Sequence, residues 1–439
     1  MATLGAALLA ALALLASSPL AEDAPPATLS LAEALRLLDD RSLALAQARA
    51  RIDEAAGVSR QALSAALPTV QIGGSYTRNS DAARAPIGQL LARQNPGAPA
   101  PPDLIIQPLE AFSASGAVRV PLVAPSAWAD VSAARAAERG AEASAEALRV
   151  QLRGALVQSA WAASAGEEIA SATLRAVASA DEQARSAERA VAAGTGVPLA
   201  VLQARTEAVK RRSDLARARA DLERARLASG VLLGRAEPVR IALPAAASPA
   251  ALDAGALTGE ALSRRAEIRA AEAQVAAAER QLASARLRWL PQLSTTASAF
   301  AQDVPLPTGK TDGWRLTLDL GWTVYDGGLR DGRARQASGA IATARAAAEA
   351  QRVAVAQEVK DAARDVALAV ERLHLAEEQA GLAGEAAATA RRGFAGGVAS
   401  SLDVLDANDR LYQSDIGLAD ARARLGLALA ALDRAAGRS

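Results

Sequence analysis

Two aspartates near the C-terminal end of the chain stand where their charges could act together. Asp403 and Asp406 are three residues apart, and side chains at this spacing share one face of a helix. Paired carboxylates attract cations and repel anions. For Asp403 a local role is equally open, because Ser400 and Asp403 form a capping-box pattern and an acid in a first turn suits the helix dipole.

The rest of the chain offers few groups for catalysis. It has no cysteine and one histidine, His374, so it has no disulfide framework, thiolate metal site, cysteine nucleophile, lipidated cysteine or histidine cluster. We interpret His374 as a surface or interface residue. No nucleophile elbow or phosphate-binding loop occurs. The net charge of +1 does not provide the strong excess of positive charge that is typical of nucleic-acid-binding proteins. We expect no enzyme activity, no cofactor, no metal site, no lipid anchor and no nucleic-acid partner.

The composition favours long helices that lie close together. The chain has 439 residues, is rich in alanine, and has only 3% aromatic residues, which is too little volume for a thick globular core. Proline disrupts helix interiors, and all 19 prolines fall outside five stretches, 27–67, 126–197, 199–237, 250–290 and 308–439. A helix over 128–193 would be ~100 Å long at 1.5 Å per residue, which exceeds a compact domain.

The apolar residues in two of these stretches repeat as in a coiled coil. Alternate steps of three and four residues, from Val201 to Leu232 and from Val404 to Ala435, reach apolar residues at eight of ten and nine of ten positions. Arg211 is one of the two positions in the first series that are not apolar. A 3.5-residue repeat sustained over four heptads predicts helices packed along a narrow seam.

The N-terminus resembles a secretory signal. Residues 6–16 form a short apolar run followed by small residues, which predicts a signal peptide over 1–21. No later stretch has 18 consecutive strongly apolar residues, so the sequence predicts no transmembrane helix. We therefore expect an exported protein.

The chain is built as an internal duplication. Val201–Ala204 (VLQA) recurs 203 residues later as Val404–Ala407 (VLDA), and Leu67-Pro68 recurs as Leu290-Pro291. This predicts repeats over 29–234 and 257–437, a linker over 235–256, and a proline-rich insertion near 86–108 in the first half. The expected elements after the first helix of repeat one are strands at 69–78 and 113–123 and helices at 128–193 and 198–234. In repeat two they are a helix at 257–289, strands at 293–302 and 314–323, and helices at 328–395 and 401–436.

One predicted strand carries a membrane signal. From Trp314 to Trp322, every second residue is Trp or Leu, and the residues between are Arg, Thr, Asp and Gly. The two tryptophans would lie ~26 Å apart along a strand, which matches an apolar band flanked by aromatic residues that anchor at the membrane interface. Four strands cannot close a barrel and open edges are not tolerated in lipid, so several chains must combine.

Two segments resemble motifs of the TolC-type outer-membrane efflux factors. Residues 322–328 (WTVYDGG) are similar to the strand-to-helix motif of that family, and residues 397–407 (GVASSLDVLDA) to its periplasmic tip turn. The resemblance covers essentially the whole chain after the signal. It implies a mostly α-helical homotrimer, with long antiparallel coiled-coil helices forming an α-barrel and four strands per chain forming a shared transmembrane 12-stranded β-barrel.

The resemblance also implies a function. The chain would be an outer-membrane channel that extends into the periplasm, surrounded by outer-membrane lipid. It would serve as the passive exit duct of a tripartite efflux or type I secretion system, with a periplasmic adaptor and an inner-membrane pump as partners. The alternatives are a periplasmic adaptor and a structural coiled-coil envelope protein without channel activity.

In that family context the tip turns become the candidate site. Asp403 and Asp406 would form stacked carboxylate rings at the pore constriction, while Gly194, Gly397 and Phe394 would lie at the tip turns that dock the adaptor. Gly194 and Gly397 also suit helix C-caps. The positions that match an Arg–carboxylate pair in some members are Ala399 and Ala200, which predicts a tip closed by packing and aspartate rings.

Overall fold

The computed structural model describes residues 28–88, 93, 97, 104–244, 253–305 and 309–438. The predicted signal peptide, 1–21, lies outside the described residues, as do most of the proline-rich insertion and part of the linker. The chain forms two compact units, which are described separately. A helical unit lies within Met1–Ala50, Ala143–Arg269 and Glu349–Ser439, and a sheet unit lies within Arg51–Glu142 and Ala270–Ala348.

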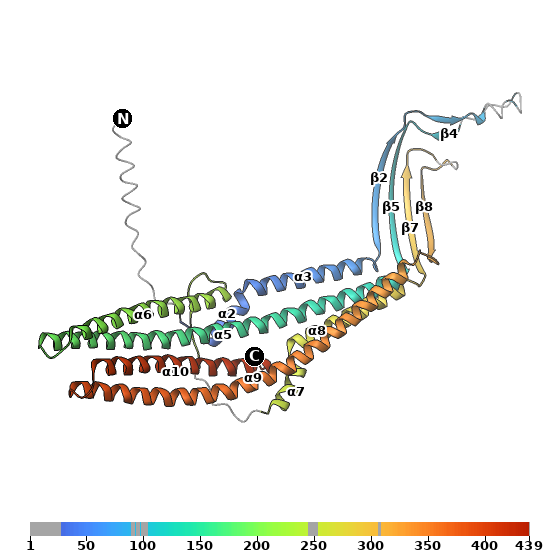
Figure 1. Ribbon diagram of the computed structural model, residues 1–439. Coiled ribbons are helices and arrows are strands. Elements are labelled where there is room, and N and C mark those ends of the chain that lie inside the picture. The colour runs from blue at the N-terminus through green and yellow to red at the C-terminus, as the bar shows by residue number, and fades with distance from the viewer. Residues whose placement is uncertain are drawn as a thin grey trace, which may run out of the picture. The chain divides into compact units, whose positions relative to one another are not determined.

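Long helices dominate the chain, as predicted (Figure 1). The two longest, α5 and α9, exceed 60 residues each. Both α5 and α6 begin at a proline, which the first helical turn accepts because its N–H has no partner there. No helix in the described part of the chain has an apolar stretch able to cross a membrane. The long helices and their partners are α5 (Pro125–Ala192), α6 (Pro198–Leu232), α9 (Leu329–Ala395) and α10 (Ser401–Ala435).

The predicted coiled-coil seams are buried inside the helical unit. On α6 the seam residues Ala204, Ala208 and Leu222 are buried, and on α10 Val404 and Leu432 are buried. Alanine at many of these positions lets neighbouring helix axes approach closely. The 3.5-residue repeat is therefore confirmed as the packing surface of α6 and α10.

The first helix of each repeat is broken into two. The structure has α2 (Leu31–Arg41) followed by α3 (Leu43–Ser64), and α7 (Ala254–Arg264) followed by α8 (Ala266–Leu287). The predicted single helix over 257–289 is therefore wrong. The chain turns extended at Ser42 and Arg265, whose N–H groups still donate to Leu38 O and Ala261 O. Both break residues are buried and neither is Pro or Gly, so tertiary packing rather than local propensity makes the break.

Two short strands and an apolar cluster join the ends of the first repeat. Strand β1 (Thr28–Ser30) pairs in parallel with β6 (Arg240–Ala242) in the linker region, a contact that the sequence did not predict. Beneath them Leu38, Leu156 and Leu233 are fully buried in one cluster. This cluster packs α2, α5 and the end of α6 together.

The sheet unit contains a four-stranded antiparallel sheet in the order β2-β5-β7-β8. Pairing between β5 and β7 joins strands from the two predicted repeats. A separate small hairpin of β3 (Ala83–Ala85) and β4 (Leu104–Gln107) was not predicted. The main strands are β2 (Thr69–Arg78), β5 (Glu110–Val123), β7 (Gln292–Gln302) and β8 (Asp312–Gly321). Strand β8 thus ends one residue before Trp322.

Candidate functional site

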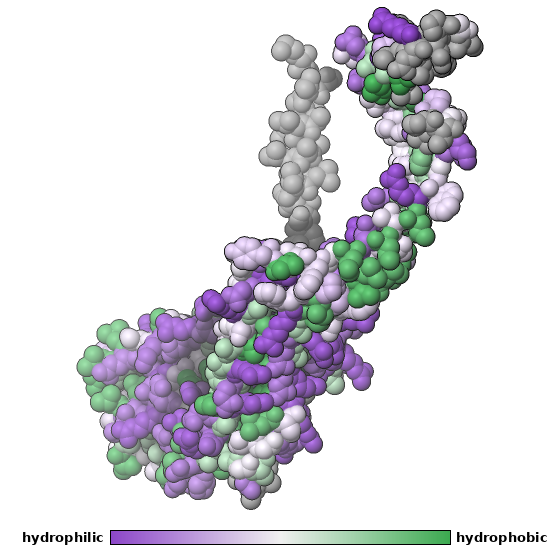
Figure 2. All heavy atoms as spheres, turned by 90° about the vertical axis from the view of Figure 1, so that its right-hand side faces the viewer, coloured by the Kyte–Doolittle hydropathy of each residue, from purple (hydrophilic) through white to green (hydrophobic). Residues whose placement is uncertain are grey.

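The register of the sheet sorts its side chains into one apolar and one polar face. Directly opposed residues in an antiparallel pair point to the same face, and pairing aligns Val70 with Val118, Val118 with Ala297, and Ala297 with Leu316. Every second residue along the four strands continues this face. The large apolar-face side chains that remain exposed include Val70, Ile72, Tyr76, Phe112, Val118, Val123, Trp314, Leu316, Leu318 and Leu320. Hydrophobic residues are visible at the surface of the strand region (Figure 2).

The two predicted anchor tryptophans lie at opposite ends of β8. Trp314 stands near its start and is 80% exposed, and Trp322 follows its end and is 63% exposed. The Trp322 indole N–H donates to the carbonyl of Trp289 at 3.2 Å. The Arg330 guanidinium lies 4.2 Å from the centroid of the Trp289 ring. Trp322 is therefore held beside a second tryptophan that the sequence analysis did not single out.

The opposite face of the sheet is mainly polar, and Phe300 is the one large apolar side chain among its paired residues. One cross-strand row on it joins Thr69, Arg119, Thr296 and Thr317, and the next joins Gln71, Ala117, Ser298 and Arg315. A large exposed apolar surface usually marks a contact with protein or membrane. A sheet that is apolar on one side and polar on the other suits a boundary between lipid and water.

The two helix-to-helix turns share one geometry. Gly194 and Gly397 both have a φ of 73°, a left-handed conformation that favours glycine. The two N–H groups that follow each glycine, on Thr195 and Gly196 and on Val398 and Ala399, donate to a single carbonyl, of Ala190 and Gly393 respectively. Both glycines therefore act as C-caps of α5 and α9. Phe394, in the last turn of α9, is half-buried.

Asp403 is engaged in the predicted capping box. Its carboxylate accepts hydrogen bonds from the Ser400 N–H and hydroxyl, each at 2.7 Å, and its N–H donates to Ser400 Oγ at 3.2 Å. The hydrogen bond from the Ser400 hydroxyl, followed by the one from its N–H, lowers the pKa of Asp403. The carboxylate is exposed and charged while it caps α10.

Asp406 has a partner that the sequence analysis missed. Its carboxylate lies 2.8 Å from the guanidinium of Arg410, one turn further along α10. Both side chains are more than half exposed, so the pair is loosely held. The i, i+4 spacing of Asp406 and Arg410 could have revealed this pair in the sequence.

A buried arginine lies deeper in the helical unit. Arg211 of α6 is 3% exposed and pairs with Glu207 and Asp214 of its own helix and with Asp409 of α10. Its guanidinium lies 4.1 Å from the ring centroid of Tyr412. Burial opposes the charge, but the hydrogen bond to Asp409 and the surrounding carboxylates outweigh it and raise the pKa of Arg211.

Tyr412 extends this cluster to a third helix, because its hydroxyl lies 3.3 Å from Thr173 Oγ1 of α5. A cavity of about 220 Å³ adjoins the cluster, lined among others by Arg211, Asn408 and Tyr412. The closure of the tip by packing and aspartate rings stays a prediction. Separately, the described residues include a polar contact among α5, α6 and α10, whose members are twelve or more residues from the turn glycines in the sequence.

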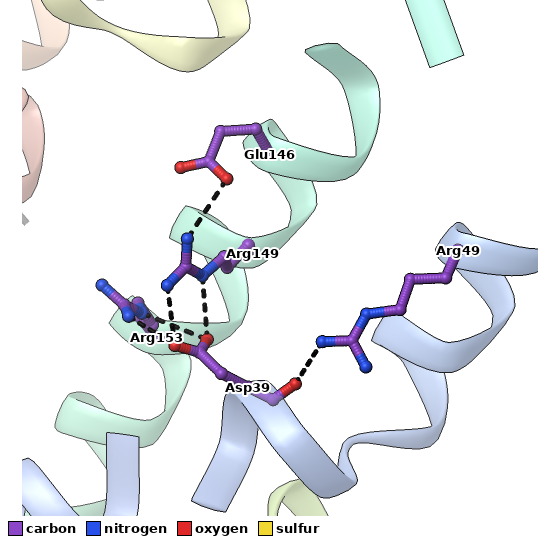
Figure 3. Close-up of polar contacts among 5 residues, drawn as sticks. All are labelled: Asp39, Arg49, Glu146, Arg149 and Arg153. Carbon is purple, nitrogen blue, oxygen red and sulfur yellow. Dashed lines mark hydrogen bonds and ion pairs between the residues drawn. The ribbon is translucent and has the colours of Figure 1, made fainter. Parts of the chain in front are cut away.

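A second ionic cluster pins α2 to α5 (Figure 3). The Asp39 carboxylate accepts two hydrogen bonds from Arg149, at 2.8 and 3.0 Å, and two from Arg153, at 2.5 and 3.3 Å. Arg49 of α3 donates to the Asp39 carbonyl at 2.6 Å. The hydrogen bonds from Arg149, supported by Arg153, lower the pKa of Asp39 to about 2.

Neither ionic cluster has the composition of a metal centre. Within the described ranges, no group of three or more His, Asp or Glu side chains could hold a metal ion. His374 lies exposed on α9, as expected for a surface residue.

Comparison with known structures shows the same fold in outer-membrane proteins. VceC from Vibrio cholerae is 20% identical with a TM-score of 0.76, covering 93% of this chain and 96% of VceC. The MtrE channel of Neisseria gonorrhoeae is 18% identical with a TM-score of 0.75, covering 93% and 88%. The CmeC channel of Campylobacter jejuni is 15% identical with a TM-score of 0.78, covering 93% and 85%. A search of the curated proteins finds no match.

A family model decides the assignment. The model described as outer membrane efflux protein matches residues 34–235 and 257–438. This match confirms the family resemblance drawn from residues 322–328 and 397–407. Because the family model covers most of the chain, the chain belongs to the outer membrane efflux protein family.

Proposed function

We propose that this protein is the passive outer-membrane exit duct of a tripartite efflux or type I secretion system and that it works as a homotrimer. The observation that carries the proposal is the two-faced sheet. Its apolar face exposes Trp314, Leu316, Leu318 and Leu320, and its other face carries polar rows. In a closed barrel the apolar face contacts lipid and the polar face lines a water-filled lumen.

The edges of the sheet support an oligomer. Strands β2 and β8 are the outer strands of the four-stranded sheet, so each has one row of backbone groups without a partner strand in that sheet. Such edges are not tolerated in lipid, and neighbouring chains must pair them. Three copies give the 12-stranded barrel that the family resemblance implies. Trp314 and Trp322 then anchor the two rims of the lipid-facing band.

The turns at Gly194 and Gly397 are the proposed docking tip for a periplasmic adaptor. Exposed apolar side chains gather there, since Val197, Leu199, Val398 and Leu402 are each more than half exposed. Phe394 lies beside the second turn. In a trimer, Asp403 and Asp406 of each chain would ring the constriction, with Arg410 balancing Asp406. The adaptor in turn connects the duct to an inner-membrane pump, which supplies the energy.

The alternatives are a periplasmic adaptor and a coiled-coil envelope protein, and both lack a lipid-facing sheet. Expression of the full chain, followed by membrane fractionation and native mass spectrometry, separates the duct from both alternatives. We expect an outer-membrane trimer that resists SDS until heated. A monomer or dimer recovered from the soluble periplasmic fraction would contradict the proposal and favour one of the alternatives.

A further inference from the structure

The polar face of the main sheet carries an excess of positive charge. Among the paired residues of β2, β5, β7 and β8, the charged side chains on this face are Arg119, Arg315 and Asp319. The charged residues in line with the apolar face, Arg78, Glu110 and Asp312, all lie at the strand ends remote from Thr69 and Gly321. The two arginines of the polar face are thus separate from these three charged residues at the strand ends.

The register places these two arginines on adjacent rows. Arg119 lies in the row of Thr296 and Thr317, and Arg315 lies in the next row, beside Ser298. Strand β7 separates them, so their Cα atoms are about 12 Å apart from strand spacing and rise. An anion that carries two or more charges can approach both guanidinium groups, whereas a chloride ion meets one at a time.

Both guanidinium groups lack a carboxylate partner within the part of the chain that the structure describes. Arg119 donates to the hydroxyl of Ser294 at 3.3 Å, and both arginines are exposed. Asp319 is one row beyond Arg119 and two strands away, with Ser294 between them, and no ion pair joins it to either arginine among the described residues. The paired residues of this face therefore include two guanidinium groups without a carboxylate partner and one carboxylate.

We propose that Arg119 and Arg315 form a belt in the lumen of the duct that binds multivalent anions and favours anionic cargo there. The inference rests on the proposed channel function, which turns the polar face toward water. In a trimer the belt holds six guanidinium groups against three carboxylates. Guanidinium is the group best suited to bind carboxylates, sulfonates and phosphates.

Planar-bilayer recording of the full-length protein tests the belt. Citrate is added to the compartment that the β-barrel end of the channel faces. We expect citrate to block the current and the salt-gradient reversal potential to show an anion contribution. The double variant Arg119→Gln/Arg315→Gln should weaken the citrate block at least about tenfold and shift the reversal potential toward cations. Asp319→Asn should shift it toward anions. The variant Arg119→Lys/Arg315→Lys, which keeps the charge, should retain the block.

Arg78→Gln is the matched control, because it removes an arginine from the other face of the same sheet. If the protein conducts, but citrate does not block the current and the double glutamine variant leaves the reversal potential unchanged, the belt is overturned. The channel proposal would still stand. If no protein conducts, the channel proposal fails. Binding of a trisulfonate dye to the detergent-solubilised protein then decides the belt, since only loss of affinity in the double glutamine variant supports it.

Discussion

Arg211 of α6 and Asp409 of α10 form an ion pair between side chains that are 198 residues apart in the chain. The arginine occupies a position on the apolar seam of α6 and is buried there. Buried charges are tolerated only when they are paired and hydrogen-bonded, and Arg211 meets three carboxylates and the face of Tyr412. One side chain thus ties the α5–α6 hairpin to α10.

Removal of Arg211 should destabilise the helical unit strongly. We expect Arg211→Met to lower the free energy of unfolding by about 2–4 kcal/mol, because Glu207, Asp214 and Asp409 lose their common partner. Asp409→Asn should cost less, since Arg211 keeps its two carboxylates on α6. Urea unfolding followed by helical circular dichroism measures both variants.

Arg224 provides the comparison on the same helix. It is 76% exposed and pairs only with Asp221 among the ion pairs of the described residues, so Arg224→Met should change the free energy of unfolding by less than about 0.5 kcal/mol. Equal effects of the two methionine substitutions would show that Arg211 contributes no more than a surface charge.

The stability of the helical unit should fall in acid through Asp39. The pKa of this carboxyl is lowered from 3.8 to about 2, so between these values the unfolded chain binds the proton more readily than the folded one. The stabilisation is fully present above about pH 4 and is lost as the pH falls through 2. It amounts to about 2 kcal/mol at neutral pH. Asp39→Asn should therefore lose about this much at pH 7 and differ little from the wild type near pH 2.

Asp40 is the natural control for this titration, because it is adjacent, exposed and of the same type. Asp40→Asn should leave the free energy of unfolding unchanged within about 0.5 kcal/mol at both pH values. A difference between wild type and Asp39→Asn that stays constant from pH 7 to pH 2 would contradict the ionic role of Asp39.

Local signals predicted the parts of this fold that depend on nearby residues. The seam of α10, the capping box of Ser400 and Asp403, and the alternation from Trp314 to Trp322 follow from spacing alone. The breaks at Ser42 and Arg265 do not, because neither residue disrupts a helix by itself. The Arg211–Asp409 pair and the β5–β7 register join distant segments, and tertiary packing creates both.

The charge at the tip should respond in opposite directions to Asp406 and its partner. In the proposed trimer Asp403→Ala/Asp406→Ala removes six carboxylates and should reduce cation selectivity, whereas Arg410→Gln removes three counter-charges and should increase it. Reversal potentials in a salt gradient measure both changes.

Ser400→Ala separates the capping role of Asp403 from its charge. This substitution removes the cap, at a cost of about 1 kcal/mol in unfolding free energy, but keeps the carboxylates. The reversal potential should stay at the wild-type value. If the aspartate and Arg410 variants also leave it unchanged, the constriction does not involve these residues.

The two faces of β8 should respond differently to the same charge. Leu318 lies on the apolar face and Thr317, its neighbour, on the polar face. We expect Leu318→Arg to cost about 2–4 kcal/mol in the membrane and to reduce the amount of outer-membrane oligomer, while Thr317→Arg is tolerated. Heat-modifiable oligomer on SDS gels reports the difference. Equal losses from both substitutions would contradict a lipid-facing assignment of the Leu318 face.

The most direct measurement of the central proposal is the current through the purified wild-type protein in a planar lipid bilayer. A trimer whose sheets close around a water-filled lumen should insert and give discrete, uniform conductance steps. Incorporation of the trimer into the bilayer without any conductance, at any applied voltage, would contradict the assignment of this chain as an outer-membrane duct.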